Sequence, residues 1–234
     1  MTGLHWSKQV DQDLDAIRSR VLLMGGLLEK QFEHAISALD GGDAALADRV
    51  SAADKDVNRL QVELDSACTE LIVRRQPAAG DLRTVIATMR VITDMERIGD
   101  EVTKVARAAK NLQARNLLLL NPYRPVRFIA ATAARMLHDA LDAYARLDRG
   151  QAVRVMAMDD ELDEAFHEMM RSLVTYMMEE PKTISPSLDM LWAAKAIERI
   201  GDHATNIGEQ VIYVLDGDDI RHKDHAKKTG EATG

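Results

Sequence analysis

A five-residue motif that occurs twice constrains this chain more than any other feature. The sequence ERIGD at residues 96–100 returns unchanged at residues 198–202, 102 positions later. A weaker match accompanies it, since DKDVN at residues 54–58 pairs with DDELD at residues 159–163. Similarity that recurs at a fixed spacing marks a repeated structural unit. We therefore predict two copies of one unit, with insertions confined to the loops.

The spacing of the apolar residues predicts an all-α protein. Val10, Leu14, Ile17 and Val21 open a series with the 3.6-residue period of a helix, and the few β-branched residues show no period-2 runs. Three helices are expected in each unit, at about residues 8–39, 43–75, 81–113, 126–147, 151–178 and 187–216. Asp43, Asp81 and Ser187 are the predicted N-caps.

Turn-forming residues divide the chain. The proline-marked segment 121–125 separates a first unit, residues 1–120, from a second, residues 121–217. Residues 218–234 form a charged tail that we expect to be disordered, and residues 1–7 are expected to fray. Gly25 and Gly26 fall inside the first helix, which indicates close approach of another helix or a local bend.

Composition restricts the function. The net charge of −8 and the pI of about 5.4 argue against a nucleic-acid-binding face. The single cysteine, Cys68, excludes an internal disulfide and is expected in the core. No apolar run reaches the roughly 20 residues of a membrane span, and the polar start does not resemble a signal peptide. We expect a soluble cytoplasmic protein.

Pairs of acidic residues lie one helical turn apart in both units. The third helices carry Glu96/Asp100 and Glu198/Asp202, and the second helices carry Asp54/Asn58 and Asp159/Asp163. On adjacent antiparallel helices, such pairs converge into a multi-carboxylate site for a hard or borderline cation. The alternative is a solvated acidic face that is paired with Arg97 and Arg199.

Two further residues are weighed as metal ligands in the second unit. Asn206 extends the acidic face, and His167 follows Asp163 by four residues. His167 also completes Glu164-x-x-His167, the spacing of di-iron bundle proteins, but those proteins need the motif twice and the first unit has no counterpart. A surface or capping role for His167 is the alternative. The sequence contains no Ser/His/Asp arrangement and no glycine-rich phosphate loop.

Seven longer segments resemble the PhoU family, the bacterial regulators of phosphate uptake and phosphate signalling. They are MGGLLEKQ (24–31), DKDVN (54–58), RRQPAAGDLR (74–83), DMERIGDEVTKVAR (94–107), MLHDALDAYARLD (136–148), LVTYMMEEPKTI (173–184) and AIERIGDHATNIGE (196–209). The resemblance covers the chain from the first helix to about Gly217. It implies two three-helix bundles related by pseudo-two-fold symmetry.

The resemblance also implies a function. Family members are accessory proteins without known enzymatic activity that repress the phosphate-starvation response. They act between the phosphate-specific ABC transporter, at its ATPase subunit, and the sensor histidine kinase of the phosphate regulon. We expect contact with the membrane through these partners only, and a homodimer.

Some family members bind iron or zinc clusters through E(D)xxxD motifs. Carried over by position, the expected ligands are Glu96, Asp100, Glu198, Asp202, Asp159, Asp163 and, less directly, Asp54. Asn58 replaces an acid of the pattern, which weakens the first site, whereas Asn58 and Asn206 remain candidate additional ligands.

Three arginines beside the 76–80 loop, Arg74, Arg75 and Arg83, are candidate partner contacts, because arginine is enriched at interfaces. Solvated loop charges or helix capping are their alternative role. For the whole chain, a metal-carboxylate enzyme of the bundle type and a metal-free helical adaptor remain the competing functions.

Overall fold

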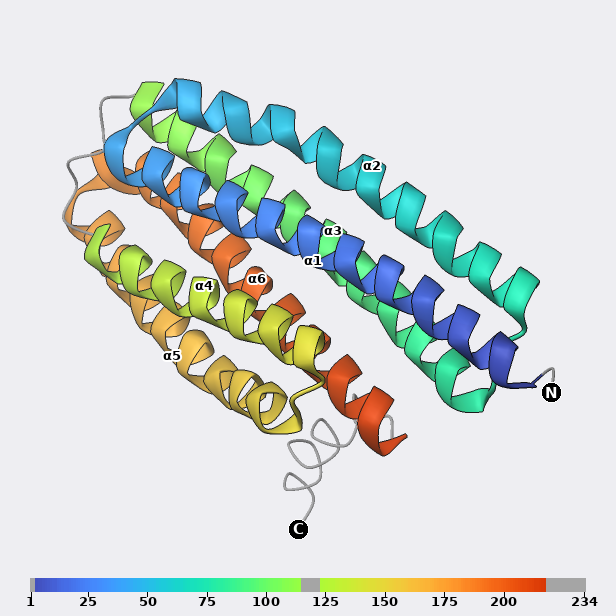
Figure 1. Cartoon of the computed structure of the whole chain (residues 1–234). Helices are drawn as coiled ribbons and strands as arrows, with labels where there is room; N and C mark the ends of the chain where they lie inside the picture. The colour runs from blue at the N-terminus through green and yellow to red at the C-terminus, as the bar shows by residue number, and fades with distance from the viewer. Residues whose placement is uncertain (1–2, 115–122, 218–234) are drawn as a thin grey trace, which may run out of the picture.

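The computed structural model describes residues 3–114 and 123–217, which form six long α-helices and one short 3₁₀ helix (Figure 1). No strand occurs in these two segments, so the all-α prediction is confirmed. The predicted tail at residues 218–234 lies outside the described residues. The elements are α1 (Gly3–Gly41), α2 (Ala44–Arg75), α3 (Ala79–Ala114), α4 (Tyr123–Arg146), α5 (Arg149–Glu179), η1 (Pro181–Thr183) and α6 (Ile184–Asp216).

The helices form two groups of three that meet along α3 and α6. Helices α1, α2 and α3 pack on one another, as do α4, α5 and α6, and Figure 1 shows the groups side by side. The pairing of α3 with α6 is the most extensive helix contact, and α1 also touches α4. The two repeated helices therefore lie at the centre of the molecule, and the predicted pair of three-helix bundles is present.

Apolar stripes on α3 and α6 supply much of the core. Met95, Ile98 and Val102 of α3 are fully buried, as are Ile197 and Ile200 of α6. These residues recur with the 3.6-residue period of a helix. Their burial is the main favourable contribution to folding, at about 25 cal/mol per Å² of apolar surface removed from water.

Two small residues of the first group occupy the positions that their size predicts. A methyl group at Gly25 would come within 2.9 Å of the Leu141 side chain, so the glycine permits close approach of α1 and α4. Cys68 is buried, and burial together with the nearby Asp65 charge raises the pKa of its thiol to about 11. This thiol is protonated at neutral pH and serves as a core residue.

The predicted N-caps are right at one helix and wrong at two. Asp43 caps α2 by accepting a hydrogen bond from the Leu46 amide at 2.9 Å. Asp81 does not cap α3, which begins at Ala79 and so places Asp81 in its first turn. Ser187 does not cap α6, because η1 leads directly into a helix that begins at Ile184, and Ser187 is buried inside it.

The α3–α4 boundary and both predicted ends of α1 also shift. Helix α4 begins at Tyr123, inside the predicted 121–125 linker, since a proline in the first turn needs no amide hydrogen. Helix α1 runs from Gly3 to Gly41, longer at both ends than the predicted 8–39.

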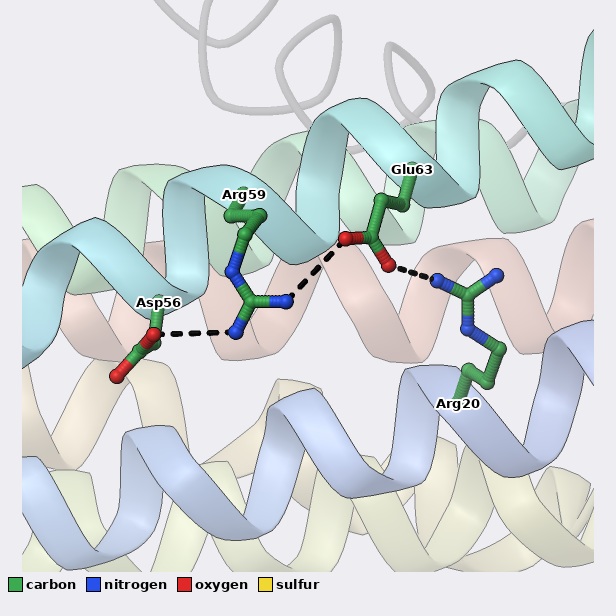
Figure 2. Close-up of polar contacts among 4 residues, drawn as sticks. All are labelled: Arg20, Asp56, Arg59 and Glu63. Atoms are coloured by element: carbon green, nitrogen blue, oxygen red, sulfur yellow. Dashed lines mark hydrogen bonds and ion pairs between the residues drawn. The ribbon is translucent and has the colours of Figure 1, made fainter.

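Charged residues form ion pairs on the outer surface of α1 and α2. Arg59 of α2 bridges Asp56 and Glu63, and Arg20 of α1 reaches Glu63 from the neighbouring helix (Figure 2). Exposed pairs of this kind stabilise a fold by only about 0–1 kcal/mol each. Within residues 3–114 and 123–217, no helix has both the length and the apolarity needed to cross a membrane.

Candidate metal centres

The acidic residues of the second unit converge as their spacing predicts. Asp159 and Asp163 lie one turn apart on α5, and Glu198 and Asp202 lie one turn apart on α6. Carboxylate oxygens of Asp163, Glu198 and Asp202 all lie within 4.8 Å of one another. Among the described residues, this is the one group of three or more acidic, histidine or cysteine side chains close enough to share a cation.

Burial and repulsion by neighbouring acids raise the pKa of two carboxylates in this group, Asp202 and Asp159. Burial raises the pKa of Asp202 to about 6, and the charges of Glu198 and Asp159 add to the effect while Lys195 opposes it. The pKa of Asp159 is also raised, first by burial and then by Asp163. Ionised carboxylates in this setting are costly unless a cation neutralises them.

One buried oxygen supports a cation at this position. Glu198 is only 6% exposed, and its Oε1 accepts a hydrogen bond from Lys195. Its Oε2 is buried and has no hydrogen-bond partner in the described part of the chain. An oxygen-rich group with an unsatisfied buried carboxylate oxygen fits a divalent metal ion, because hard cations favour carboxylate ligands.

The first unit builds a looser version of the same arrangement. Burial, followed by the Asp100 charge, raises the pKa of Asp54, and the pKa of Glu96 rises through burial, Asp100 and Asp54 in turn. Asn58 donates a hydrogen bond from Nδ2 to Asp54 Oδ2 at 3.1 Å. Asp54 Oδ1 is buried without a hydrogen-bond partner in the described residues. The four residues therefore gather, but an amide takes the place of the fourth acid.

The two extra candidate ligands of the second unit make other contacts. Asn206 of α6 donates from Nδ2 to Asp94 Oδ1 at 3.1 Å, so its amide points toward α3. His167 is exposed, and its Nδ1 donates to the Asp163 carbonyl oxygen at 2.7 Å within α5. The surface or capping role weighed for His167 matches this contact, and ligation by either residue stays a prediction.

Two groups of polar contacts between α3 and α6 were missed by sequence reasoning. Asp94 is buried and accepts hydrogen bonds from His203 Nδ1 at 2.9 Å and from Asn206. Glu101, also buried, pairs with Arg199 of α6 at 3.5 Å. The sequence held an indication of these contacts, because Asp94 is the repeat equivalent of Ala196. A polar residue that replaces alanine on a core-facing stripe needs a partner.

The three arginines expected at a partner surface lie at one end of the molecule. Arg74 is exposed and pairs with an acid of its own helix. Arg75 donates from Nε to Asp13 of α1 at 2.9 Å, so it joins two helices. The Arg83 guanidinium lies against Gly217 at the end of α6. Arg75 and Arg83 thus have internal contacts, and Arg74 faces solvent.

Comparison with known proteins identifies related chains along the whole length. The PhoU domain matches residues 21–109 and again residues 126–211, once in each unit. A Pseudomonas putida protein named phosphate-specific transport system accessory protein PhoU homolog is 43% identical over 98% of this chain and 90% of its own length. The Escherichia coli (strain K12) accessory protein PhoU is 41% identical over 93% of this chain and 90% of its own length.

Solved structures agree with the observed architecture. The crystal structure of PhoU from Pseudomonas aeruginosa superposes with a TM-score of 0.85 at 42% identity, covering 89% of this chain and 99% of that one. The PhoU structure from Streptococcus pneumoniae gives a TM-score of 0.83 at 24% identity over 89% of this chain and 98% of its own, which supports the fold alone.

Proposed function

This chain belongs to the PhoU family, and on that basis we propose that it is a negative regulator of the phosphate-starvation regulon that also modulates phosphate uptake. It acts by contact with two partners, the ATPase subunit of the phosphate-specific ABC transporter and the sensor histidine kinase of the regulon. It works at the cytoplasmic side of the membrane, reached through these partners, and as a homodimer.

The observation that supports this proposal is the extent of the match to accessory proteins of the phosphate-specific transport system. Identity above 40% extends over at least 93% of the chain for the relatives from Pseudomonas putida and Escherichia coli. Both repeats match the same domain. A relationship over both units supports a shared role better than a motif in one unit does.

The second acidic centre gives the regulator a metal-dependent element. Asp163, Glu198 and Asp202, with Asp159 beside them, would hold a divalent metal ion or an iron or zinc cluster. A bound cation neutralises these carboxylates and links α5 to α6. A cation that binds only the folded chain also stabilises it by mass action.

The competing function of a metal-carboxylate enzyme has less support. The Glu164-x-x-His167 spacing of di-iron bundle proteins occurs once and not twice, and His167 lies outside the group of Asp163, Glu198 and Asp202 that could share an ion. The metal centre therefore fits a structural or regulatory role better than a redox site.

The regulatory proposal is tested in a deletion strain that carries a reporter for a phosphate-starvation promoter. Loss of a repressor leaves the promoter active in phosphate-rich medium, and the intact gene restores repression. A deletion strain that still represses the reporter at high phosphate would show that this chain does not have the proposed role.

The same strain tests the three arginines. Arg74→Ala, Arg75→Ala and Arg83→Ala are introduced together, and Arg59→Ala serves as the matched control because it is another exposed, ion-paired arginine of α2. We expect derepression with the triple variant and none with the control. Since Arg75 also joins α1 to α2, thermal unfolding of the purified variants separates a lost contact from a lost fold. Full repression by the folded triple variant removes the arginines from the interface.

A further inference from the structure

The seam between α3 and α6 has two faces that the internal repeat makes equivalent, and one face is filled by polar contacts. On that face Asp94 accepts hydrogen bonds from His203 and Asn206. Arg90 donates to Gln210 at 3.3 Å, and its guanidinium lies 5.3 Å from the centre of the Tyr213 ring. This face of the seam is closed by its own side chains.

The equivalent residues on the other face leave a groove of about 260 Å³ between α3 and α6. By the 102-residue offset, Ala196 is the repeat equivalent of Asp94, and Ala108 is the equivalent of Gln210. Two small side chains therefore line the groove where the closed face has larger polar ones. Trp192 takes the position of Arg90 and is 68% exposed. The groove thus results from small residues and an uncovered aromatic side chain.

Positive charge surrounds this groove in a chain whose net charge is −8. Four cationic side chains line it, Lys104, Arg107, Lys195 and Arg199, against the two acids Glu101 and Asp189. Glu101 pairs with Lys104 and Arg199, and Glu198 pairs with Lys195. Arg107 is exposed and forms no ion pair within residues 3–114 and 123–217. Arginine and tryptophan are both enriched at the energetic centres of protein interfaces.

An exposed apolar stripe on α6 leads into the same groove. Ile184, Leu188 and Trp192 are spaced four residues apart on one face of the helix and are 45%, 42% and 68% exposed. Contiguous exposed apolar residues rimmed by charge mark interaction sites. The cavity is smaller than the roughly 300–1,000 Å³ of small-molecule pockets, which favours side chains of a protein partner as its occupant.

We propose that the Trp192 groove, comprising the Ile184–Leu188–Trp192 stripe and the four cations beside it, is a docking surface for an acidic amphipathic helix of a partner protein. The apolar face of that helix covers the stripe, and its Asp and Glu side chains meet the cations. This inference rests on the proposed function only in requiring a protein partner.

Site-specific photocrosslinking in the producing cells tests the docking surface. The photoreactive residue p-benzoylphenylalanine replaces Leu188 in the full chain, and the same residue at Val62, an exposed position of α2, is the control. Mass spectrometry then identifies the captured peptide. We expect a peptide from another protein with more Asp and Glu than Lys and Arg, and no comparable capture at Val62.

Second-site variants then test the chemistry of the groove. Arg107→Glu and Trp192→Ala should each lower the crosslinking yield at residue 188 several-fold, because one reverses a rim charge and the other removes the aromatic contact. Arg49→Glu, which changes an exposed arginine of α2, should leave the yield unchanged. Equal losses from Arg107→Glu and Arg49→Glu would contradict a local charge contact.

The identity of the captured molecule decides the rest. Capture no greater than at Val62, a peptide from a second copy of this chain, a basic peptide, or a nucleic acid would each overturn the proposal. The outcome at residue 188 comes from the otherwise unaltered chain, so it does not depend on whether the second-site variants fold. The reporter strain separates the two proposals, since derepression on deletion without acidic capture removes this surface alone.

Discussion

The two acidic clusters come from the same repeat, yet the second is more enclosed and more strongly charged than the first. Glu198 is buried, whereas its counterpart Glu96 is half-buried, and Asp100 is exposed where Asp202 is half-buried. On the second helix of each unit, Asn58 stands where the second unit has an acid. One changed side chain and a deeper position thus distinguish the two clusters.

The ERIGD motif alone does not create a candidate metal site. Both copies of ERIGD place two carboxylates on one helix face, but within the described part of the chain the oxygens come close enough to share an ion where the neighbouring helix adds Asp163. In the first unit the amide of Asn58 donates to Asp54 and provides part of the compensation that a metal would otherwise supply. Four experiments test this difference between the two units.

Removal of the acid pair of each third helix should produce the largest difference. Glu198→Ala with Asp202→Ala should weaken metal binding roughly hundredfold, because even outer-shell residues of metal sites contribute about 10–100-fold and these two residues are proposed as direct ligands. Glu96→Ala with Asp100→Ala should lower bound metal much less. Elemental analysis and titration of the purified variants with Mn²⁺ or Zn²⁺ provide the measurement.

The exposed acid Asp56 supplies the control for this experiment, since Asp56→Ala removes a carboxylate of α2 that pairs with Arg59 outside both clusters. Metal content should be unchanged in that variant. Equal loss from the two acid-pair variants, or a parent protein that binds no metal, would rule out the stated difference between the halves.

The helical arrangement and the acid pairs could be predicted from the sequence because both depend on local spacing. The 3.6-residue period of Val10, Ile17 and Val21 predicted a helix whose apolar face is buried, and the i, i+4 spacing set Glu198 and Asp202 on one face. These features need no knowledge of which helix lies opposite.

Contacts between the repeats could not be predicted in the same way. The hydrogen bond of His203 to Asp94 joins residues 109 positions apart, and its existence depends on the register of α3 against α6. The N-cap assigned to Ser187 failed for a different, local reason. The Thr183 hydroxyl donates to the Glu180 carbonyl at 2.6 Å in the turn before α6, so the helical path begins earlier than the capping pattern indicates.

The second-largest difference is expected when the glycine of each motif, Gly99 or Gly201, is replaced by alanine. An ideal Cβ at Gly201 would overlap Leu162 Cδ2, whereas the nearest atom at Gly99 is Asp54 Oδ1 at 3.2 Å. Gly201→Ala should destabilise the fold by about 2 kcal/mol, because the buried Leu162 must move. Gly99→Ala should change stability by less than about 1 kcal/mol, since alanine also gains helix propensity.

Urea unfolding of the variants measures both effects, and Gly26 offers the matched control. It lies inside α1 with no atom within 4 Å of an added Cβ, so Gly26→Ala should stabilise the chain by roughly 0.5–1 kcal/mol. If Gly201→Ala proved as neutral as Gly99→Ala, the tighter packing of the second unit would be refuted.

The pH dependence of the metal-free protein should show a smaller difference. The pKa of Asp202 is about 6 in the folded chain against 3.8 for the free side chain, so the folded state retains a proton that the unfolded state loses. Stability should therefore fall as pH rises from about 4 to 7. Asp202→Asn should remove this loss and stabilise the chain at pH 7 by about 1 kcal/mol, a value reduced for the partial exposure of the group.

Urea unfolding in the presence of a chelator, at pH 4.5 and at pH 7, tests this pH effect. Asp100→Asn in the first unit is the matched comparison and should change stability by less than about 0.5 kcal/mol, because Asp100 is exposed. With metal bound at pH 7, the parent should be more stable than Asp202→Asn, since the ionised Asp202 carboxylate binds the cation and protons compete with the cation for it. Equal stability of Asp202→Asn and the parent at pH 7 without metal would contradict the burial of this carboxylate.

The smallest effect is expected when the first site is given the acid that it lacks. Asn58→Asp removes the 3.1 Å hydrogen bond to Asp54 and places a like charge beside it, so the metal-free chain should lose about 0.5 kcal/mol at pH 7. Added Mn²⁺ or Zn²⁺ should more than restore that loss, because ligand that binds only the folded state stabilises it by mass action. Asp163→Asn in the second unit should have the opposite signature, with greater metal-free stability and weaker stabilisation by metal. Unfolding midpoints with and without metal for the two exchanges measure how much of the difference between the halves this one position carries. If Asn58→Asp gains nothing from metal, the depth of the second site, rather than its fourth acid, accounts for the difference.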